Sequence, residues 1–361
     1  MVKVKPVKKR FLRRNVFTVI QEEEGKVDLV YVNNRQSGIT RKKKGRKFFY
    51  YSEKKEIKDE RELERIRRLA IPPAWKKVWI CPFPNGHLQA TGIDAKNRKQ
   101  YRYHELWNQQ RNKTKFHRLF AFGKTLPAIR RKVRKDLSLP GLPEEKVLAT
   151  VISLMERTNI RIGNTLYEKL YGSYGLTTFK DRHVKVEGDR MRFDFKGKKG
   201  IYHSIAVKNK TLARIVRKCR DIPGKELFQY ITKEGDHRTI DSGMVNNYIK
   251  TISGKEFSAK DFRTWTGTVH AFHFLRKLDK NKPGLLTRKK IVQAMDEVSK
   301  ELGNSRTICK KYYVHPVIIS LCENNCIQKY SRESNGIRMP GLTCEEKLLM
   351  KILKKEKETN N

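Results

Sequence analysis

The sequence predicts an α+β protein with a small β-rich N-terminal domain and a larger, mainly α-helical domain that contains a β-hairpin. Three observations support this fold class. Short runs of β-branched and aromatic residues alternate with Gly, Asn and Pro up to about residue 110. Helical periodicity then dominates, and one group of alternating strands interrupts it. The 361 residues suit two domains, or three at most.

The first 110 residues contain short strands and one helix. Strands are expected at Val27–Val32, Lys47–Ser52 and Lys77–Ile80. A helix is expected near Asp59–Leu69, because Leu63, Ile66 and Leu69 fall on one helical face. This region therefore predicts a sheet with one covering helix.

The rest of the chain is expected to be mostly helical. Glu144–Glu156 has apolar residues in helical phase, and a second helix runs from a capping Thr287 to Leu302, closed by Gly303. Strands are expected at Val184–Val186, Met191–Phe195 and Ile201–Ile205, joined at Gly188 and at the Gly197-Lys198-Lys199-Gly200 turn. The tail after Pro340 predicts one short amphipathic helix.

The net charge points to a polyanionic partner. The chain has 82 Lys and Arg against 38 Asp and Glu, a formal net charge of +44. Self-repulsion of this size destabilises a compact state unless a polyanion neutralises it. Nucleic acid is the leading candidate, and an anionic membrane is the alternative. No apolar run approaches the roughly 20 residues of a spanning helix, so no membrane partner is expected.

The six cysteines are scattered, and only Cys322 and Cys326 lie close in sequence. No further Cys or His pair completes a zinc set around them. They are interpreted as reduced thiols, which predicts a cytoplasmic protein. A nucleic-acid partner would make it nucleoid-associated.

Five segments contain residues suited to chemistry on a polyanion. They are Arg161-Ile162-Gly163-Asn164 followed by Tyr167, Phe195-Lys196-Gly197-Lys198-Lys199, Lys260-Asp261-Phe262-Arg263-Thr264-Trp265, Leu302-Gly303-Asn304-Ser305, and Lys310-Lys311-Tyr312-Tyr313-Val314-His315-Pro316. Phosphoryl transfer from DNA to a side chain needs a nucleophile, cations or donors on the non-bridging oxygens, and an acid for the leaving 5′-oxygen. Arginine, lysine and tyrosine supply these parts, and no metal or other cofactor is required.

The order of these segments resembles the poxvirus-like type IB DNA topoisomerases, bacterial members included, within the superfamily that also holds the tyrosine recombinases. The N-terminal part is similar too, in Ile71-Pro72-Pro73-Ala74-Trp75, Val78-Trp79-Ile80-Cys81-Pro82, Asn85-Gly86-His87, Gln89-Ala90-Thr91-Gly92 and Arg98-Lys99-Gln100-Tyr101-Arg102-Tyr103. The resemblance covers roughly Gly38 to Pro316. It implies a clamp around double-stranded DNA and ATP-independent relaxation of supercoils through a 3′-phosphotyrosyl intermediate.

By this resemblance the catalytic residues are Arg161, Lys198, Arg263, Asn304 and Tyr313. The poxvirus enzymes have histidine at the fourth position, whereas some bacterial members share the asparagine. Asparagine donates a hydrogen bond to a phosphate oxygen but carries no proton in the reaction. The family's nucleophile lies nine residues after this position, which selects Tyr313 over Tyr312.

Each catalytic candidate also has a purely structural interpretation. Arg161 could be an ordinary surface arginine. Lys198 could simply be part of a hairpin turn, and Lys196 and Lys199 are alternative candidates for its catalytic role. Arg263 near Trp265 suits a buried stack. Asn304 after a helix suits a cap, and the remaining tyrosine, Tyr312, suits packing.

Further basic and aromatic residues are predicted to contact DNA phosphates, which gives affinity without sequence readout. They are Arg41, Lys42, Lys43, Arg98, Lys99, Gln100, Tyr101, Arg102, Tyr103 and Tyr167. For the 41–47 cluster a solvated charge run is the alternative. His270 and His273 are interpreted as packing histidines, because no third metal ligand lies nearby in sequence.

The expected domains are a basic N-terminal arm (1–32), a small β-rich DNA-binding domain (33–110), a catalytic domain (111–330) and a helical C-terminal tail (331–361). A monomer is expected. Two alternative functions remain. A tyrosine recombinase usually has histidine three residues before the second arginine, where this chain has Lys260. A non-catalytic basic DNA-binding protein would explain the charge but not the ordered segments.

Overall fold

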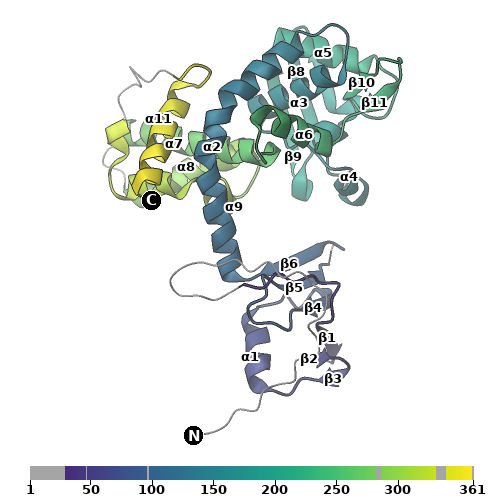
Figure 1. Cartoon of the computed structure of the whole chain (residues 1–361), viewed down its shortest axis with the longest axis vertical. Coiled ribbons are helices and arrows are strands. Elements are labelled where there is room, and N and C mark those ends of the chain that lie inside the picture. The colour runs from purple at the N-terminus through teal and green to yellow at the C-terminus, as the bar shows by residue number, and fades with distance from the viewer. Residues whose placement is uncertain (1–28, 46, 96, 282–285, 331–338, 360–361) are drawn as a thin grey trace. The chain divides into compact units, whose positions relative to one another are not determined.

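The computed structural model describes residues 29–45, 47–95, 97–281, 286–330 and 339–359. The chain divides into two compact units, Met1–Thr114 and Lys115–Asn361. Most of the expected basic arm, residues 1–28, lies outside the described residues. The two units are described separately below, with elements labelled as in Figure 1.

The first unit is built on an antiparallel sheet with the strand order β3-β2-β1-β4-β5-β6. Its elements are β1 Ile39–Lys44, β2 Lys47–Ser52, β3 Lys55–Glu56, α1 Glu60–Arg68, β4 Lys76–Ile80, β5 Leu88–Ile93 and β6 Lys99–Tyr103. The strand predicted at Lys47–Ser52 is confirmed, and the one predicted at Lys77–Ile80 forms all but the first residue of β4. The strand predicted at Val27–Val32 is wrong within the described residues, because Val30 makes only one isolated bridge, with Gly86.

Helix α1 covers the core of the first unit. The Asp59 side chain caps it by accepting a hydrogen bond from the Arg61 backbone N–H at 3.1 Å. Ile66 is buried against a small cluster that includes Val78 and Ile80. The amphipathic helix expected from Leu63, Ile66 and Leu69 is therefore confirmed.

The second unit is mainly helical. Its helices are α2 Glu105–Leu137 (which begins in the first unit), α3 Glu144–Thr158, α4 Thr165–Tyr171, α5 Lys210–Arg220, α6 Ser242–Ser253, α7 Ala259–Asn281, α8 Thr287–Leu302, α9 Arg306–Tyr312, α10 Pro316–Glu323 and α11 Cys344–Thr359. Short 3-10 turns are η1 Leu176–Thr178, η2 Asp181–His183, η3 Lys198–Gly200 and η4 Ile327–Tyr330. Among the described residues, no helix combines the length and the apolar character that crossing a membrane requires.

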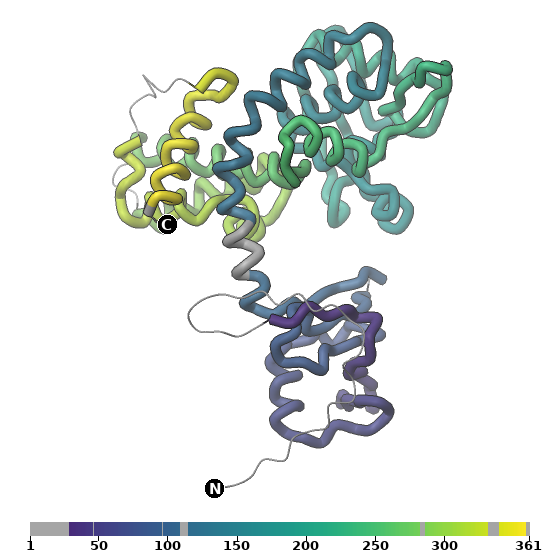
Figure 2. The backbone as a smooth tube through the Cα atoms, in the orientation of Figure 1, coloured from purple at the N-terminus to yellow at the C-terminus, as the bar shows by residue number. Residues whose placement is uncertain are grey.

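One extended core holds the second unit together. Most side chains of α3 are buried, the polar Thr150 and Ser153 among them, so this helix lies at the centre of the core. The C-terminal helix α11 contacts α7 and α10, and Figures 1 and 2 show it beside α7. It buries Leu348, Leu349 and Ile352 in the same core. The segment after Pro340 therefore does more than form a tail, since it completes the main core.

Two small sheets complete the second unit. Strands β7 Val184–Glu187, β8 Arg190–Lys196 and β9 Tyr202–Lys208 form an antiparallel sheet in that order, and β10 Gln229–Ile231 pairs with β11 His237–Thr239. The three predicted strands are confirmed, except that the last begins at Tyr202 and not at Ile201. Residues Gly197–Gly200, called the hairpin tip below, join β8 to β9. Lys199 there adopts a left-handed conformation with a φ of 66°.

The start of α8 differs from the prediction. Thr287 is the first helical residue and not the cap, which is Leu286 without a side-chain hydrogen bond. The Leu286 carbonyl already accepts the backbone N–H of Lys290 at 3.1 Å, so the helical hydrogen bonds begin one residue earlier. Gly303 closes the helix in a left-handed conformation, as expected.

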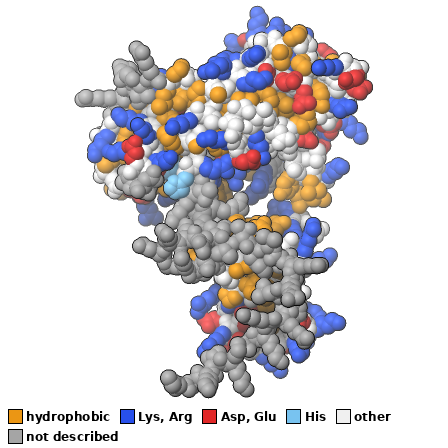
Figure 3. Space-filling view, in the orientation of Figure 1, with side chains coloured by type: hydrophobic (Ala, Val, Ile, Leu, Met, Phe, Trp, Pro, Cys, Tyr) orange, Lys and Arg blue, Asp and Glu red, His pale blue; other side chains and the backbone are white. Residues whose placement is uncertain are grey.

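Positive charge is spread over the surface of the second unit. Figure 3 shows Lys and Arg side chains across its visible face, with fewer Asp and Glu between them. Such a surface suits a polyanion, in line with the net charge of +44.

Candidate active site

Four of the five predicted catalytic residues meet where several helices end. Arg161 follows α3, Asn304 follows α8, Tyr313 closes α9, and Arg263 lies on α7. We call these four residues the helix-end cluster. The fifth predicted residue, Lys198, lies on the hairpin tip.

Arg161 is fixed in a loop that depends on close backbone packing. Its carbonyl accepts the Leu176 N–H at 2.9 Å, and Gly175 lies so near that an added Cβ would come within 2.5 Å of the Arg161 oxygen. The Arg161 guanidinium donates through Nη2 to Asn304 Oδ1 at 2.7 Å. Burial and the charge of Arg263 lower the pKa of Arg161 to about 10, which leaves it cationic at neutral pH.

Arg263 is the most buried cation of the cluster, with 6% of its surface exposed. Its Nη1 donates to the carbonyl of Asn159, at the end of α3. Its Nη2 donates at 2.7 Å to the carbonyl of Leu302, at the end of α8. Both carbonyls carry the partial negative charge of helix C-termini, which favours a cation there. Burial lowers the pKa of Arg263, while the nearby Tyr313 opposes that shift.

Arg263 does not stack on Trp265, which was the structural alternative left open by the sequence. The Trp265 indole N–H donates to Glu346 Oε1 at 2.8 Å. Arg263 Cζ instead lies 5.3 Å from the centroid of the Tyr313 ring. The arginine therefore faces the predicted nucleophile.

Tyr313 is held against α7 by a glycine and a threonine. A Cβ on Gly267 would come within 2.8 Å of the Tyr313 carbonyl oxygen, so only glycine permits this approach. The Thr268 hydroxyl lies 3.2 Å from the same oxygen and accepts the His315 backbone N–H at 3.1 Å. Tyr312 lies outside these contacts, with Lys311 Nζ 5.5 Å from its ring centroid.

Asn304 does not act as the cap of α8. The left-handed residue is Gly303, and the Asn304 backbone N–H donates to the Ser299 carbonyl at 3.1 Å. The Asn304 side chain therefore remains available to accept from Arg161. Its amide Nδ2 lies 3.4 Å from the Leu302 oxygen, a long and weak hydrogen bond.

Lys198 is exposed at the hairpin tip. Partial desolvation of its ammonium and the charge of Arg161 lower the pKa of Lys198, while Tyr313 opposes the shift. The Lys198 ammonium therefore interacts electrostatically with Arg161 and Tyr313 of the helix-end cluster.

Sequence analysis missed His203 on β9. Its ring packs so closely on Gly303 that a Cβ there would lie 2.4 Å from His203 Cε1, and a Cβ on Gly197 would lie 2.7 Å from Cδ2. Burial and the charges of Arg161 and Arg263 lower the pKa of His203. His203 thus joins the hairpin tip to the end of α8, and only its position in a strand was visible beforehand.

Several residues predicted to bind DNA have partners inside the first unit. Arg41 donates to the carbonyls of Ile71, Pro72 and Trp75, and Arg102 donates to those of Leu69 and Ala70. Arg98 and Gln100 both bind the Asp94 carboxylate. These four side chains therefore have a structural role that sequence analysis did not predict.

The other DNA-contact candidates divide by exposure. Lys42, Lys43, Lys99 and Tyr101 are exposed on the first unit, and Tyr103 is half-buried with its ring 6.0 Å from that of Tyr101. Tyr167 is 53% exposed on α4, beside exposed Leu166 and Leu170. The exposed members, Lys42, Lys43, Lys99, Tyr101 and Tyr167, are accessible to a ligand.

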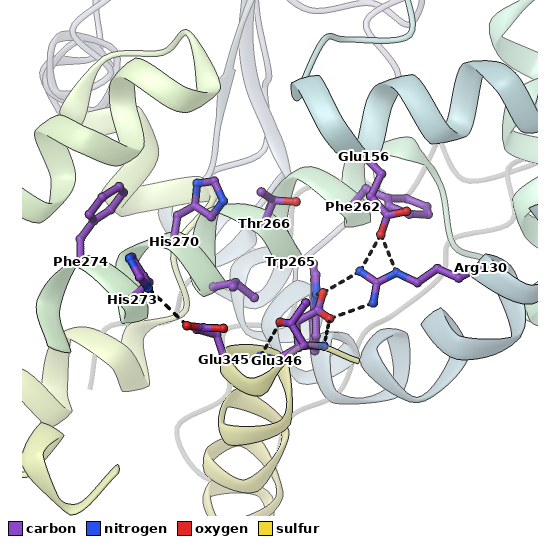
Figure 4. A pocket seen from close by; sticks show the side chains of 12 residues that line it. Arg130, Glu156, Phe262, Trp265, Thr266, His270, His273, Phe274, Glu345 and Glu346 are labelled. Carbon is purple, nitrogen blue, oxygen red and sulfur yellow. Dashed lines mark hydrogen bonds and ion pairs between the residues drawn. The ribbon is translucent and has the colours of Figure 1, made fainter. Parts of the chain in front are cut away.

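The two histidines of α7 line a pocket next to α11 (Figure 4). His273 Nδ1 lies 3.5 Å from a Glu345 oxygen, and burial lowers the pKa of His270. Glu346 in the same pocket accepts from Arg130, Trp265 and the Thr343 backbone N–H. Within the described ranges, no three His, Cys, Asp or Glu side chains gather as metal ligands.

Arginines beside a tyrosine in a strongly basic chain are the parts that chemistry on a nucleic-acid phosphodiester needs. Comparison with known proteins gives the family. Residues 104–337 match the catalytic core of eukaryotic DNA topoisomerase I, and residues 47–94 match the N-terminal domain of bacterial DNA topoisomerase IB. The chain belongs to the type IB DNA topoisomerase family, and it is an enzyme of the isomerase class that acts on DNA.

Viral relatives agree with this assignment. The chain is 32% identical to DNA topoisomerase 1B of Acanthamoeba polyphaga mimivirus over 80% of this chain and 88% of the relative. It is 22% identical to DNA topoisomerase 1B of vaccinia virus over 64% of this chain and 72% of the relative. The family assignment decides against the recombinase and the non-catalytic DNA-binding protein.

Proposed function

We propose that Tyr313 is the nucleophile that cuts one DNA strand during supercoil relaxation. Its hydroxyl oxygen attacks a backbone phosphate, forms a 3′-phosphotyrosyl bond and releases a 5′-hydroxyl. The broken strand rotates about the intact one, and the 5′-hydroxyl then reverses the attack. The phosphotyrosyl bond conserves the energy of the phosphodiester, so no ATP is consumed.

The observation that supports this proposal best is the position of Arg263 at the Tyr313 ring, 5.3 Å from Cζ to the centroid. Arg263 is held by the ends of two helices, so it needs no rearrangement to stabilise charge as the phosphate is attacked. Arg161 supplies the second cation. Asn304 accepts from Arg161 through its oxygen, which leaves its amide N–H to donate to a phosphate oxygen.

Lys198 is the proposed acid for the leaving 5′-oxygen. Its lowered pKa makes it a better proton donor than an ordinary lysine at neutral pH. Lys199 adopts a left-handed backbone conformation with a φ of 66°. The charges of Arg161 and Tyr313 act on the Lys198 ammonium, so we assign the acid to Lys198 and not to its neighbour.

DNA binding is proposed to involve both units. Lys42, Lys43, Lys99 and Tyr101 would contact the backbone from the first unit, and Tyr167 from the second. The enzyme is proposed to act as a monomer on double-stranded DNA in the cytoplasm, at the nucleoid, without a membrane partner. The arginines supply the positive charge at the phosphate, so a metal cofactor is not part of the proposed mechanism.

Two assays test this function. Relaxation of a supercoiled plasmid should proceed in EDTA without ATP, and strict dependence on a divalent ion would contradict the mechanism. Tyr313→Phe should abolish covalent trapping on a nicked substrate while DNA binding stays near normal, because only one hydroxyl is removed. Tyr312→Phe is the matched control and should remain active. An exchange of these two phenotypes would move the nucleophile to Tyr312.

A further inference from the structure

Lys115, on α2, brings a further cation to the proposed nucleophile. Its Nζ lies 5.3 Å from the centroid of the Tyr313 ring. The neighbouring Phe116 packs edge-on against the His315 ring, with centroids 5.0 Å apart. This stretch of α2 therefore packs against the loop that carries Tyr313.

The environment of the Lys115 ammonium is unusual. Nζ is inaccessible to solvent and has no hydrogen-bond acceptor among the described residues. Burying an ammonium without an acceptor costs free energy, and an apolar side chain would fill this space without that cost. Burial and the charge of Lys260 lower the pKa of Lys115 to about 7, while Asp261 opposes the shift. A buried lysine in this environment calls for a functional explanation.

The position of Lys115 indicates what that function is. The other lysines discussed above, such as Lys42 and Lys198, are exposed and suit direct contact with DNA. Lys115 instead lies beside the Tyr313 ring, which Arg263 also approaches to 5.3 Å. When a DNA phosphate enters, its negative charge favours the charged form of the amine.

We propose that Lys115 is a positioning residue that holds the Tyr313 ring and stabilises the negative charge on its oxygen during attack and release. The inference rests on the proposed role of Tyr313. In cleavage the Tyr313 Oη–P bond forms and the P–O5′ bond breaks. The phenolic proton passes to solvent, and the 5′-oxygen takes a proton from Lys198. Lys115 exchanges no proton. In religation the Tyr313 oxygen leaves the phosphorus with the same negative charge, which Lys115 again stabilises.

The first test compares variants at Lys115. Lys115→Met keeps the length and removes the charge, whereas Lys115→Arg keeps a charge. Lys124→Met is the matched control, since Lys124 also lies on α2 over an aromatic ring, that of Phe120, but is exposed. Cleavage and religation rates are measured in single turnover, together with DNA affinity and the melting temperature.

Lys115→Met should slow cleavage and religation alike by about 10- to 10²-fold, the scale of one nearby charge. Its cleavage equilibrium and DNA affinity should change little. Lys115→Arg should recover most of the rate, and Lys124→Met should match wild type. Wild-type rates in Lys115→Met, or a loss confined to DNA affinity, would overturn the proposal. If Lys115→Met has a lowered melting temperature, the rates of Lys115→Arg decide the test. A rate loss in Lys115→Arg as large as that in Lys115→Met would contradict the proposal.

A second test separates the nucleophile from the leaving group. Replacing Tyr313 by 3,5-difluorotyrosine, a more acidic phenol, should restore most of the Lys115→Met rate and little of the Lys198→Ala rate. A 5′-bridging phosphorothiolate should do the reverse, because sulfur leaves without a proton. Rescue of Lys115→Met by sulfur alone would overturn the proposal. Failure of the proposed function is seen separately, as a wild-type covalent adduct that does not map to Tyr313.

Discussion

The helix-end cluster and the hairpin tip hold their cations in different ways. Arg263 is buried and donates to the last carbonyls of α3 and α8, and Arg161 donates to Asn304. Lys198 is exposed and reaches the cluster only through electrostatic interactions. The cluster's cations are therefore part of the folded core, whereas the lysine is free to follow a leaving group.

This difference predicts that activity and stability are coupled in the cluster and independent at the tip. Removing a cluster cation exposes unpaired carbonyls in the core, which costs free energy. Removing the tip lysine leaves no buried group without a partner. The following experiments test that distinction, from the largest expected effect to the smallest.

Arg263→Ala should have the largest effect. Loss of a preorganised cation at the phosphate is expected to slow cleavage by about 10³-fold or more. The carbonyls of Asn159 and Leu302 lose the hydrogen bonds from the guanidinium, so the free energy of unfolding should also fall by about 2–3 kcal/mol. Lys277→Ala, an exposed lysine on the same helix, is the control and should leave both quantities unchanged. A slow but fully stable Arg263→Ala enzyme would break the proposed coupling.

Lys198→Ala should slow cleavage by about 10²–10⁴-fold, the usual contribution of a positioned acid. Its melting temperature should match wild type, because the side chain has no buried partner. A 5′-bridging phosphorothiolate should restore most of the rate, and it should do little for Arg263→Ala. Lys199→Ala should behave nearly like wild type. If the sulfur substrate rescues Lys199→Ala or Lys196→Ala but not Lys198→Ala, the general acid is that neighbouring lysine and not Lys198.

Glu346→Ala tests the scaffold behind the cluster. Glu346 accepts from Arg130 and Trp265, and Trp265 lies two residues after Arg263 on α7. Breaking this buried pair should lower the free energy of unfolding by about 3 kcal/mol, measured by urea denaturation. Glu358→Ala, in an exposed pair with Lys354, should cost far less. Equal losses of unfolding free energy in Glu346→Ala and Glu358→Ala would contradict a scaffold role for Glu346.

The same variant has a predicted pH dependence. Burial alone would raise the pKa of Glu346, but the hydrogen bond and charge of Arg130 outweigh it and lower the pKa. A carboxyl with a lowered pKa stabilises the fold above its unfolded-state pKa, and this contribution is lost as the pH falls through the folded-state value. The stability difference between wild type and Glu346→Ala should therefore shrink in acid. A difference that grows as the pH falls would contradict this sign.

Asn304→Ala should have the smallest effect, about 10- to 10²-fold on cleavage, because a neutral donor contributes less than a cation. The α8 terminus should stay intact, since Gly303 and not Asn304 closes it. Asn304→His should retain activity, because histidine can also donate a hydrogen bond to a phosphate oxygen. Loss of folding in Asn304→Ala would instead support a capping role.

Much of the fold followed from local patterns. Helix α1, helix α3 and the three strands β7–β9 were predicted because apolar periodicity and turn residues act over a few neighbours. The errors also have local causes. Val27–Val32 has strand composition but finds only one bridging partner, Gly86, among the described residues. The first helical hydrogen bond of α8 uses the Leu286 carbonyl, which composition does not reveal.

For the site, sequence order identified the candidates but not their surroundings. Arg161 and Asn304 are 143 residues apart and meet at 2.7 Å, a contact that no local pattern contains. His203 and Lys115 carried no motif, and they became visible only through what they pack against. Arg41 looked like a DNA contact, yet it binds three carbonyls of its own unit.

The sequence by itself determined the charge, the order of the candidate residues and part of the secondary structure, because each depends on composition or on near neighbours. Only the tertiary structure decided which cations are buried, which carbonyls pair with Arg263 and which side chains surround Tyr313. Burial and pairing arise from contacts between distant segments. The same residue types, Arg and Lys, therefore serve as core anchors, surface contacts or neighbours of a nucleophile according to where the chain folds back on itself.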